Sequence, residues 1–418
     1  MVLLALVGLL GSLLTGCGIG SAASSTSATT AITAPTSPYS PYLALMQRAL
    51  SKALKSVHVT LPTKAGAPPP VLPPGAFGPG LGSRQVFGFL PSWEISDAAS
   101  LDYRALTEVA YYALQVEPHG TILRTGQGWS TLAGGAVNTL VADAHASGVR
   151  ALLTLFSQTQ STLAGLAADP VAAGTTLADQ VAPLLTAYHF DGVDLDLEGQ
   201  IASGRSGFVR FVAAFTHRLS ELGPSWSVVL NTLPQAAVDP ESFFNVKALA
   251  PYVDQFFVMA YDMSSMSSPG PTAPLTGAEL SDLSVLASYQ SVVPASKIIL
   301  GIPFYGYDFT TYTPNPPSGV IGAPYAVTYQ SVVEAAHPAQ WDSVTETPYA
   351  SFKRQGQWHE TWYDDPTSVA LKVALAAAFD VGGVGAWDLG MAAGEPQMTY
   401  ALDGGSPPAR LPLVSAGP

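Results

Sequence analysis

The sequence is poor in charge and has a single cysteine. Asp, Glu, Lys and Arg make up 11% of the 418 residues, against about a quarter in average proteins. The lone Cys17 excludes a disulfide within the chain. Basic residues number 17 against 30 acidic ones, which gives a net charge of -13. Because phosphate binding requires a basic surface, we exclude nucleic acid as a partner.

Apolar residues are abundant instead. Hydrophobic residues make up 48% of the chain and aromatic residues 10%, enough to bury a sizeable core. The length allows two or three average domains, or one large barrel with attachments. The composition favours the single barrel.

The first 17 residues, MVLLALVGLLGSLLTGC, form an apolar run too short for a comfortable membrane span. They predict a signal peptide, and the residues from Leu14 to Cys17 resemble a bacterial lipobox, in which the cysteine is lipidated. We therefore expect a lipid-anchored protein outside the cytoplasm. The alternative is ordinary secretion with an incidental cysteine.

Residues 18–83 predict a tether rich in Ser, Thr and Pro. Within it, 42–57 has helical periodicity and basic residues, which suits either a membrane-surface helix or a short solvated or docked helix, and we favour the second. A Pro/Gly linker follows at 65–83, and 405–418 reads as a flexible tail.

Eight short apolar runs alternate with helical patterns between residues 84 and 404, which predicts a closed (β/α)₈ TIM barrel. The predicted strands are 85–90, 108–114, 150–156, 192–198, 227–233, 255–261, 297–303 and 382–387. The predicted helices include 131–147, 171–188, 206–222, 278–291 and 367–380. A doubly wound open sheet is the competing fold, but no Gly-rich phosphate turn supports it.

The connection between the last two strands is longer than one helix and its loops require. We predict a small α+β insertion at about 304–365. Its many aromatic residues either line one wall of a groove or form the core of the insertion.

Residues suited to sugar binding stand at the predicted carboxyl ends of the strands, where barrels build their active sites. They are Trp93, Gln158, Glu198, Asn231, Tyr261, Asp262, Tyr305 and Trp387. Aromatic rings there could stack on sugars, and amides and carboxylates could bond hydroxyl groups. Each aromatic residue could equally cap the core.

Three acids alternate with three apolar residues in the stretch DGVDLDLE. Asp194, Asp196 and Glu198 therefore share one face of a strand, and that face looks into the barrel lumen. Unpaired buried carboxylates are costly, and a fold tolerates them mainly at functional sites. Two alternatives are a metal cage and a solvent-facing edge strand. The seven histidines are scattered, so we predict no metal site, and an edge strand is not expected directly after a helix and FDG.

DGVDLDLE resembles the DxxDxDxE signature of glycoside hydrolase family 18, the chitinase-like barrels, with Asp191 at its first position. MAYD (259–262), GIPFYG (301–306) and GGVGAWDLG (382–390) are similar to further motifs of that family. GFLPSW and QWHETWYDD are most similar to its bacterial branch of spore-cortex and cell-wall glucosaminidases. Strand three departs from the family, because TLFSQT (154–159) replaces an SxGG-like turn.

The resemblance implies substrate-assisted hydrolysis of N-acetylglucosamine polymers such as chitin or peptidoglycan, with retention of configuration. It implies Glu198 as general acid, Asp196 and Tyr261 on the substrate acetamide, and Asp194 supporting Asp196. It further implies Trp387 under the sugar, Met259 and Asp262 shaping its pocket, and a structural Asp191. We expect Trp93, Tyr305 and Asn231 to bind substrate, no cofactor, and a monomer. The non-enzymatic alternative is a lectin-like lipoprotein.

Overall fold

The computed structural model describes residues 37–57, 61–64, 66–70, 84–199, 201–223 and 225–404. The predicted lipidation site Cys17 and the predicted tail at 405–418 lie outside the described residues.

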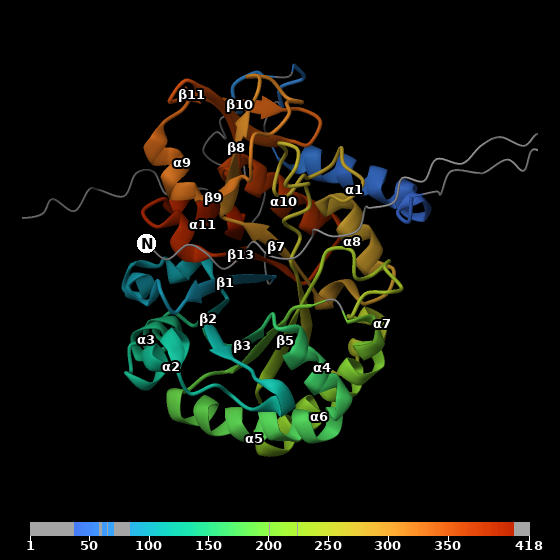
Figure 1. The fold of residues 1–418 in the computed structure, drawn as a ribbon, viewed down its shortest axis with the longest axis vertical. Coiled ribbons are helices and arrows are strands. Elements are labelled where there is room, and N and C mark those ends of the chain that lie inside the picture. Colours follow the sequence, from blue (N-terminus) through green and yellow to red (C-terminus); the bar gives the residue numbers. More distant parts are fainter. Residues whose placement is uncertain are drawn as a thin grey trace, which may run out of the picture. The chain divides into compact units, whose positions relative to one another are not determined.

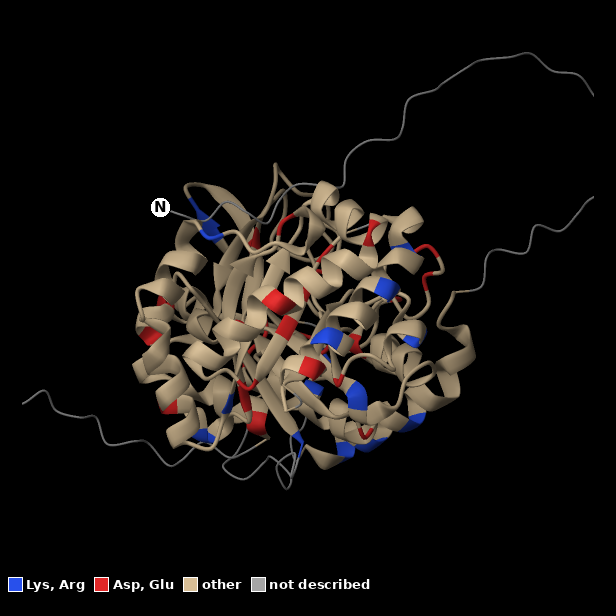
Figure 2. Ribbon diagram, turned by 90° about the horizontal axis from the view of Figure 1, so that it is seen from below, with Lys and Arg blue, Asp and Glu red and all other residues tan. Residues whose placement is uncertain are grey.

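Charged positions are sparse and scattered over the ribbon (Figure 2). No described helix is long and apolar enough to cross a membrane.

Eight parallel strands close into a barrel, in the order β1-β13-β7-β6-β5-β4-β3-β2, which confirms the predicted fold (Figure 1). The strands are β1 (Gln85–Pro91), β2 (Glu108–Gln115), β3 (Arg150–Ser157), β4 (Gly192–Leu197), β5 (Ser227–Thr232), β6 (Gln255–Val258), β7 (Ile298–Pro303) and β13 (Gly383–Trp387). Buried parallel strands read as short apolar runs because both of their faces are covered. All eight were visible in the sequence for that reason.

Side-chain alternation divides the barrel core into two layers. Val193, Leu195 and Leu197 of β4 point outward and join the large cluster between strands and helices. A second cluster fills the lumen, with Phe87, Phe89 and other residues of β1, β2, β3, β5, β6 and β7. The acids of β4 therefore lie on the lumen side, as the period of two requires.

The barrel helices are α2 (Gly126–Ala133), α3 (Val137–Ala146), α4 (Gln160–Ala168), α5 (Pro170–Tyr188), α6 (Arg205–Leu222), α7 (Val246–Leu249), α8 (Asp282–Gln290), α10 (Pro366–Ala378) and α11 (Pro396–Asp403). The single helix predicted over 131–147 is two helices, because Gly134 and Gly135 interrupt it and Gly135 has φ 79°. Helix α8 begins four residues later than predicted, where Ser281 caps it with a reciprocal bond to Ser284. Short 3₁₀ segments are η1 (Ser40–Tyr42), η2 (Ile95–Ser100), η3 (Tyr103–Ala105), η4 (Pro118–Gly120), η5 (Ala202–Gly204), η6 (Ala295–Lys297) and η7 (Leu389–Ala392).

The predicted insertion between barrel strands seven and eight is confirmed as a lobe with a five-stranded antiparallel sheet, in the order β10-β11-β12-β8-β9. It comprises β8 (Tyr305–Thr311), β9 (Tyr325–Thr328), α9 (Tyr329–Ala335), β10 (Ala339–Asp342), β11 (Thr347–Arg354) and β12 (Gln357–Trp362). Trp341 is fully buried within it. One aromatic cluster of its sheet contacts Tyr261 and Trp387 of the barrel. The aromatic residues therefore serve both predicted purposes, the core of the lobe and a wall beside the barrel mouth.

The helix predicted at 42–57 is α1 (Leu43–Ser56), and it lies against α8 and α10 (Figure 1). Ala49, Ala53 and Val57 are buried in the core, whereas Arg48 and Lys52 are exposed. Of the two interpretations, the docked helix is the one observed. Ala67 also pairs with Trp341 of β10, so the described parts of the predicted tether pack on the barrel and its lobe.

Candidate active site

The three acids of DGVDLDLE lie at the carboxyl end of β4. Asp194 is fully buried and Asp196 is 3% exposed. Glu198 follows the strand, with its backbone N–H donating to the carbonyl oxygen of Ser157 at 2.9 Å. Because successive positions of one face are about 6 to 7 Å apart, the three carboxyl groups form a ladder that rises toward the barrel mouth.

Burial raises the pKa of every acid in this ladder. It raises the pKa of Asp194 to about 8, although the neighbouring polar side chains of Thr154 and Asn231 oppose the change. The pKa of Asp196 lies well above its ordinary value because of burial and then the charges of Glu198 and Asp194. Burial also raises the pKa of Glu198. The site therefore favours carboxyl groups that keep a proton near neutral pH.

The ladder has few hydrogen-bond partners among the described residues. Asn231 Nδ2 donates to Asp194 Oδ2 at 3.4 Å, and Gln158 Nε2 donates to Glu198 Oε1 at 3.0 Å. Buried oxygens Asp194 Oδ1 and Asp196 Oδ1 accept no hydrogen bond from a described protein group. Buried polar atoms normally have partners, so these oxygens point to a ligand or to a shared proton.

Aromatic rings form the floor beside the ladder. The centroids of Trp387 and Tyr112 are 4.6 Å apart with the rings nearly perpendicular, and Trp387 also packs on Phe89 at 5.3 Å. The ring centroids of Trp93 and Tyr112 are 6.0 Å apart, and Trp93 is 52% exposed. The sequence did not single out Tyr112, although its parity in β2, two positions after the lumen-facing Ala110, could have placed it in the lumen.

Asp262 and two tyrosines connect the barrel to the lobe. Tyr305 Oη and Tyr307 Oη donate to Asp262 Oδ1 at 2.8 and 2.9 Å. Burial raises the pKa of Asp262, and these two bonds oppose the change. Tyr305 also packs edge-on against Tyr261 at 6.0 Å. Tyr307 is a second residue that the sequence did not indicate, because it lies in the insertion and has no motif of its own.

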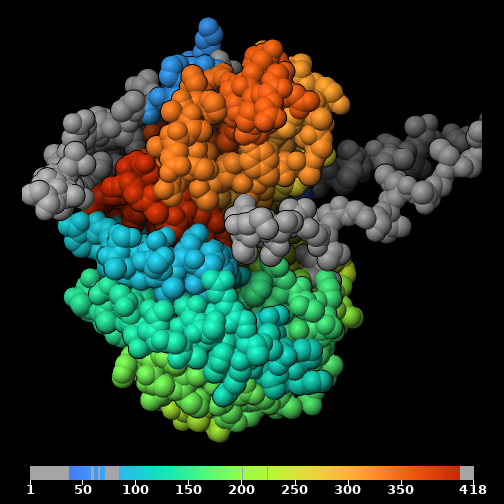
Figure 3. Space-filling model, turned by 60° about the vertical axis from the view of Figure 1, so that its left-hand side comes forward, coloured from blue at the N-terminus to red at the C-terminus, as the bar shows by residue number. Residues whose placement is uncertain are grey.

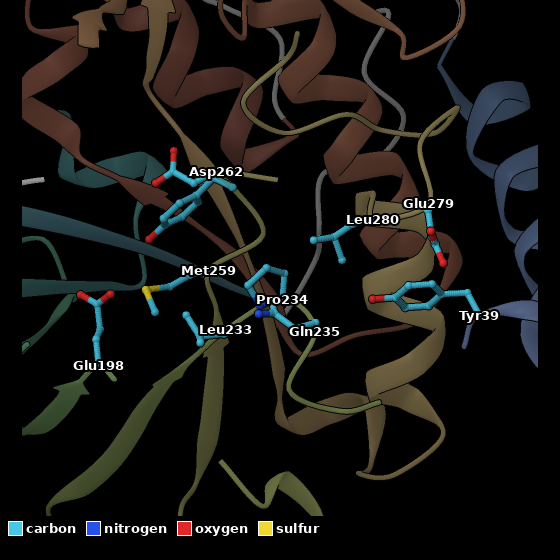
Figure 4. A pocket seen from close by; sticks show the side chains of 10 residues that line it. Tyr39, Glu198, Leu233, Pro234, Gln235, Met259, Asp262, Glu279 and Leu280 are labelled. Atoms are coloured by element: carbon cyan, nitrogen blue, oxygen red, sulfur yellow. The ribbon is translucent and has the colours of Figure 1, made fainter. Parts of the chain in front are cut away.

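A pocket of about 400 Å³ opens beside Glu198. Its lining consists of Tyr39, Glu198, Leu233, Pro234, Gln235, Met259, Tyr261, Asp262, Glu279 and Leu280 (Figure 4). Glu198, Met259, Tyr261 and Asp262 were predicted site residues, and the structure brings them together here. In the space-filling view the lobe stands above the barrel segments that carry β1 to β4 (Figure 3).

Asp191 lies apart from the site, at the start of β4. Its Oδ2 accepts a hydrogen bond from the Ala151 backbone N–H at 2.8 Å and lies 2.9 Å from His145 Nε2. These contacts tie β4 to β3 and α3. They agree with a role in the scaffold rather than in chemistry.

Possible metal ligands are not grouped in the part of the chain that the structure describes. There, no cluster of three or more His, Cys, Asp or Glu side chains is arranged to hold a metal ion.

The chain belongs to family 18 of the glycosyl hydrolases, whose sequence profile matches residues 85–392. It is 26% identical over 245 residues to the di-N-acetylchitobiase of Rattus norvegicus, which covers 53% of this chain and 66% of that protein. It is also 26% identical over 213 residues to the cortical fragment-lytic enzyme of Bacillus anthracis, which covers 49% of this chain and 47% of that protein. The chain thus spans about half to two thirds of the length of these relatives.

Solved structures share the fold. A family 18 chitinase from Cycas revoluta, in complex with (GlcNAc)3, superposes with a TM-score of 0.68 at 19% identity, covering 76% of this chain and 98% of the other. The spore cortex-lytic enzyme SleL of Bacillus cereus gives a TM-score of 0.62 at 18% identity, covering 78% and 76%. The resemblance drawn from the sequence motifs is confirmed at the level of the family.

Proposed function

We propose that this protein hydrolyses β-1,4 glycosidic bonds in a polysaccharide containing N-acetylglucosamine, chitin or peptidoglycan, with retention of configuration and assistance from the substrate. The observation that carries the proposal is the ladder of Asp194, Asp196 and Glu198, buried at the mouth of a family 18 barrel. The ladder has no Lys or Arg among its described hydrogen-bond or ion-pair partners. No described cation therefore holds these acids in the ionised form, so they can take up and release protons.

Glu198 is the general acid of this proposal. It stands last in the ladder, lines the pocket, and has a raised pKa. Its proton passes to the glycosidic oxygen as the bond from that oxygen to the anomeric carbon breaks. The ionised Glu198 then takes a proton from water as the hydroxyl adds to the anomeric carbon and the bond from that carbon to the acetamide oxygen breaks.

Asp196 and Tyr261 act on the acetamide of the substrate. Asp196 accepts its N–H while the acetamide oxygen forms a bond to the anomeric carbon, so the nucleophile comes from the sugar itself. Tyr261 lines the same pocket and donates to that oxygen. Asp194, directly below on β4, shares a proton with Asp196 and holds it in position. In each of these roles the side chain must face the charge that develops on the substrate in the transition state.

The remaining predicted residues position the sugar. Trp387 provides an aromatic surface beside the ladder, and Met259 and Asp262 line the pocket. Tyr305 fixes Asp262, and Asn231 fixes Asp194. The exposed indole of Trp93 is available at the barrel mouth to stack on a neighbouring sugar. The protein acts as a monomer in this scheme.

The decisive test concerns the nucleophile. An oligosaccharide lacking the N-acetyl group at the cleavage site should not be turned over, and Asp196→Asn should lose most of the rate. Mass spectrometry of the enzyme during turnover of an activated fluorosugar should detect no covalent adduct, and the product should keep its anomeric configuration. A stable glycosyl adduct on Asp194 or Asp196 would falsify substrate assistance. Tight binding without any cleavage would favour a lectin-like protein instead.

We also propose attachment to the membrane through lipidated Cys17, because it is the sole cysteine and follows an apolar run. Cys17→Ser should move the protein from the membrane fraction to the medium or to an unprocessed pool. Unchanged fractionation and normal processing would contradict this proposal.

A further inference from the structure

The segment before the barrel contains a tandem repeat, SPYSPY, at residues 37–42. It precedes the family match, which begins at residue 85. Its two tyrosines have different surroundings. Tyr42 packs against the core, and its hydroxyl accepts a hydrogen bond from Ser291 Oγ at 3.1 Å. Tyr39 instead lines the pocket that contains Glu198.

Tyr39 is held firmly in that position. The residue is 6% exposed, and its backbone carbonyl accepts the N–H of Tyr42 at 2.9 Å at the start of η1. The helix that follows, α1, packs against α8 and α10. Burial and then the charges of Glu279 and Asp239 raise the pKa of Tyr39 to about 12. Its hydroxyl therefore keeps its proton and can donate a hydrogen bond at physiological pH.

The pocket has two ends. Figure 4 shows Glu198 at one side and Tyr39 with Glu279 at the other, with Pro234 and Gln235 between them. The Tyr39 hydroxyl points toward the interior of the pocket (Figure 4). The far end thus combines a phenol, an amide and a carboxylate with the apolar side chain of Leu280.

This combination suits a sugar ring. A pyranose has apolar C–H faces, which Leu280 and Pro234 can cover, and hydroxyl or amide groups at its rim, which Tyr39, Gln235 and Glu279 can bond. None of the ten described residues that line the pocket is Lys or Arg, whereas three are acidic. A neutral sugar fits such a lining better than one carrying a free carboxylate, because two negative charges would repel.

We propose that Tyr39, Gln235 and Glu279 form a distal subsite for a neutral hexosamine unit, away from the unit at which the bond is cleaved. This proposal rests on the proposed glycosidase function. The segment ahead of the barrel is then part of the substrate site, and chains long enough to reach Tyr39 gain affinity from it. Short substrates that stop before it do not.

The test is a series of chitooligosaccharides of increasing length, with kcat/KM measured for each. In Tyr39→Phe the ring stays and one hydrogen bond is lost, so kcat/KM should fall about three- to tenfold on the longer substrates. Tyr39→Ala should lower it further. Both variants should match the wild type on the shortest substrate that is cleaved. Binding of the long oligosaccharide to Glu198→Gln, with and without Tyr39→Phe, provides a readout independent of turnover.

Tyr42→Phe is the matched control, because it removes the hydroxyl of the other tyrosine of the repeat and keeps the ring that packs against the core, without touching the pocket. It should leave the dependence on substrate length unchanged. The subsite is disproved if Tyr42→Phe reproduces the effect of Tyr39→Phe, or if Tyr39→Phe and the wild type respond equally to chain length. In the second case an active wild type leaves the proposed function standing. A wild type that neither binds nor cleaves any oligosaccharide would overturn both.

Discussion

Two groups of buried carboxylates in this protein have opposite surroundings. In the first group, Asp282 at the start of α8 and Asp364 after β12 flank Lys372 of α10, whose Nζ lies 2.6 Å from Asp282 Oδ2 and 3.6 Å from Asp364 Oδ1. All three side chains are essentially inaccessible. In the second group, Asp194 and Asp196 on β4 are equally buried, but no Lys or Arg is among their described partners.

The difference separates scaffold from chemistry. Burial alone would lower the pKa of Lys372. Asp282 and Asp364 together have a larger, opposite effect, so the pKa lies above its ordinary value and the lysine stays charged. At β4 no described cation pairs with Asp194 or Asp196, and burial raises the pKa of both, which favours the forms that hold a proton. Where the fold buries Asp282 and Asp364, it places Lys372 beside them as a counter-charge. On the proposed mechanism, a cation beside the ladder would favour the ionised acids and remove the protons that catalysis needs.

The largest effect is expected from removing the cation of the first group. Lys372→Met leaves Asp282 and Asp364 buried without a counter-charge, so the free energy of unfolding should fall by about 3–5 kcal/mol. Chemical denaturation measures it. Combining Lys372→Met with Asp282→Asn and Asp364→Asn should recover much of the loss. A single variant as stable as the wild type would show that the cluster does not need its lysine.

The next effect concerns the end of the ladder. Glu198→Gln keeps the shape of the side chain and removes the transferable proton, so kcat should fall at least about 10²-fold while binding of oligosaccharide is kept. Glu108→Gln is the matched control, since Glu108 is also buried in the barrel but at the start of β2, paired with Arg150 at 2.7 Å. Its replacement should affect stability rather than kcat. Equal losses of kcat in both variants would contradict the assignment.

A smaller effect should appear in the pH dependence of stability. Asp194 has a pKa of about 8 when folded, against about 3.9 in an unfolded chain. Between these values the unfolded chain loses a proton that the folded chain keeps, so the contribution of Asp194 to stability is full below pH 4 and is lost as the pH rises through 8. Relative to the wild type, Asp194→Asn should gain at least about 1 kcal/mol between pH 4 and pH 8. Parallel stability curves for the two proteins would refute this.

The sequence predicted the barrel and the ladder well because both depend on local periodicity. Apolar runs gave the strands, and the period of two placed Asp194, Asp196 and Glu198 on one face. The break between α2 and α3 was missed, although Gly134 and Gly135 signal it.

The sequence could not supply the rest of the site because that part depends on contacts distant along the chain. Tyr39 reaches the pocket through the packing of α1 on α8 and α10, which no local pattern encodes. Tyr112 stands in an apolar strand among residues of the same kind, and Tyr307 lies in the insertion. Motif reasoning therefore recovered the family and the position of the three acids, and left the walls of the site incomplete.

The smallest effect also bears on the contrast between the two groups, because it concerns a neutral hydrogen-bond donor to Glu198 at the upper end of the ladder. Gln158 Nε2 donates to Glu198 Oε1 at 3.0 Å, and this bond opposes the rise that burial gives to the pKa of Glu198. It comes from TLFSQT, the stretch in which strand three departs from the family pattern. On the proposed mechanism Gln158 is a positioning residue that lowers the pKa of the acid without adding charge.

Gln158→Leu removes the donor, so the ionised form of Glu198 loses a stabilising bond and its pKa should rise. The general acid would then keep its proton to higher pH, and the alkaline limb of the kcat/KM profile should move up by about half to one pH unit. Gln158→Glu places a carboxylate beside Glu198 and should move the limb further in the same direction. A uniform loss of kcat/KM at every pH, with the limb unmoved, would mean that Gln158 only supports the structure. A shift would show that this neutral amide opposes the rise in the pKa of Glu198, as Lys372 opposes the rise that burial gives to the pKa of Asp282 and Asp364, and that it does so without a cation that would favour the ionised acid.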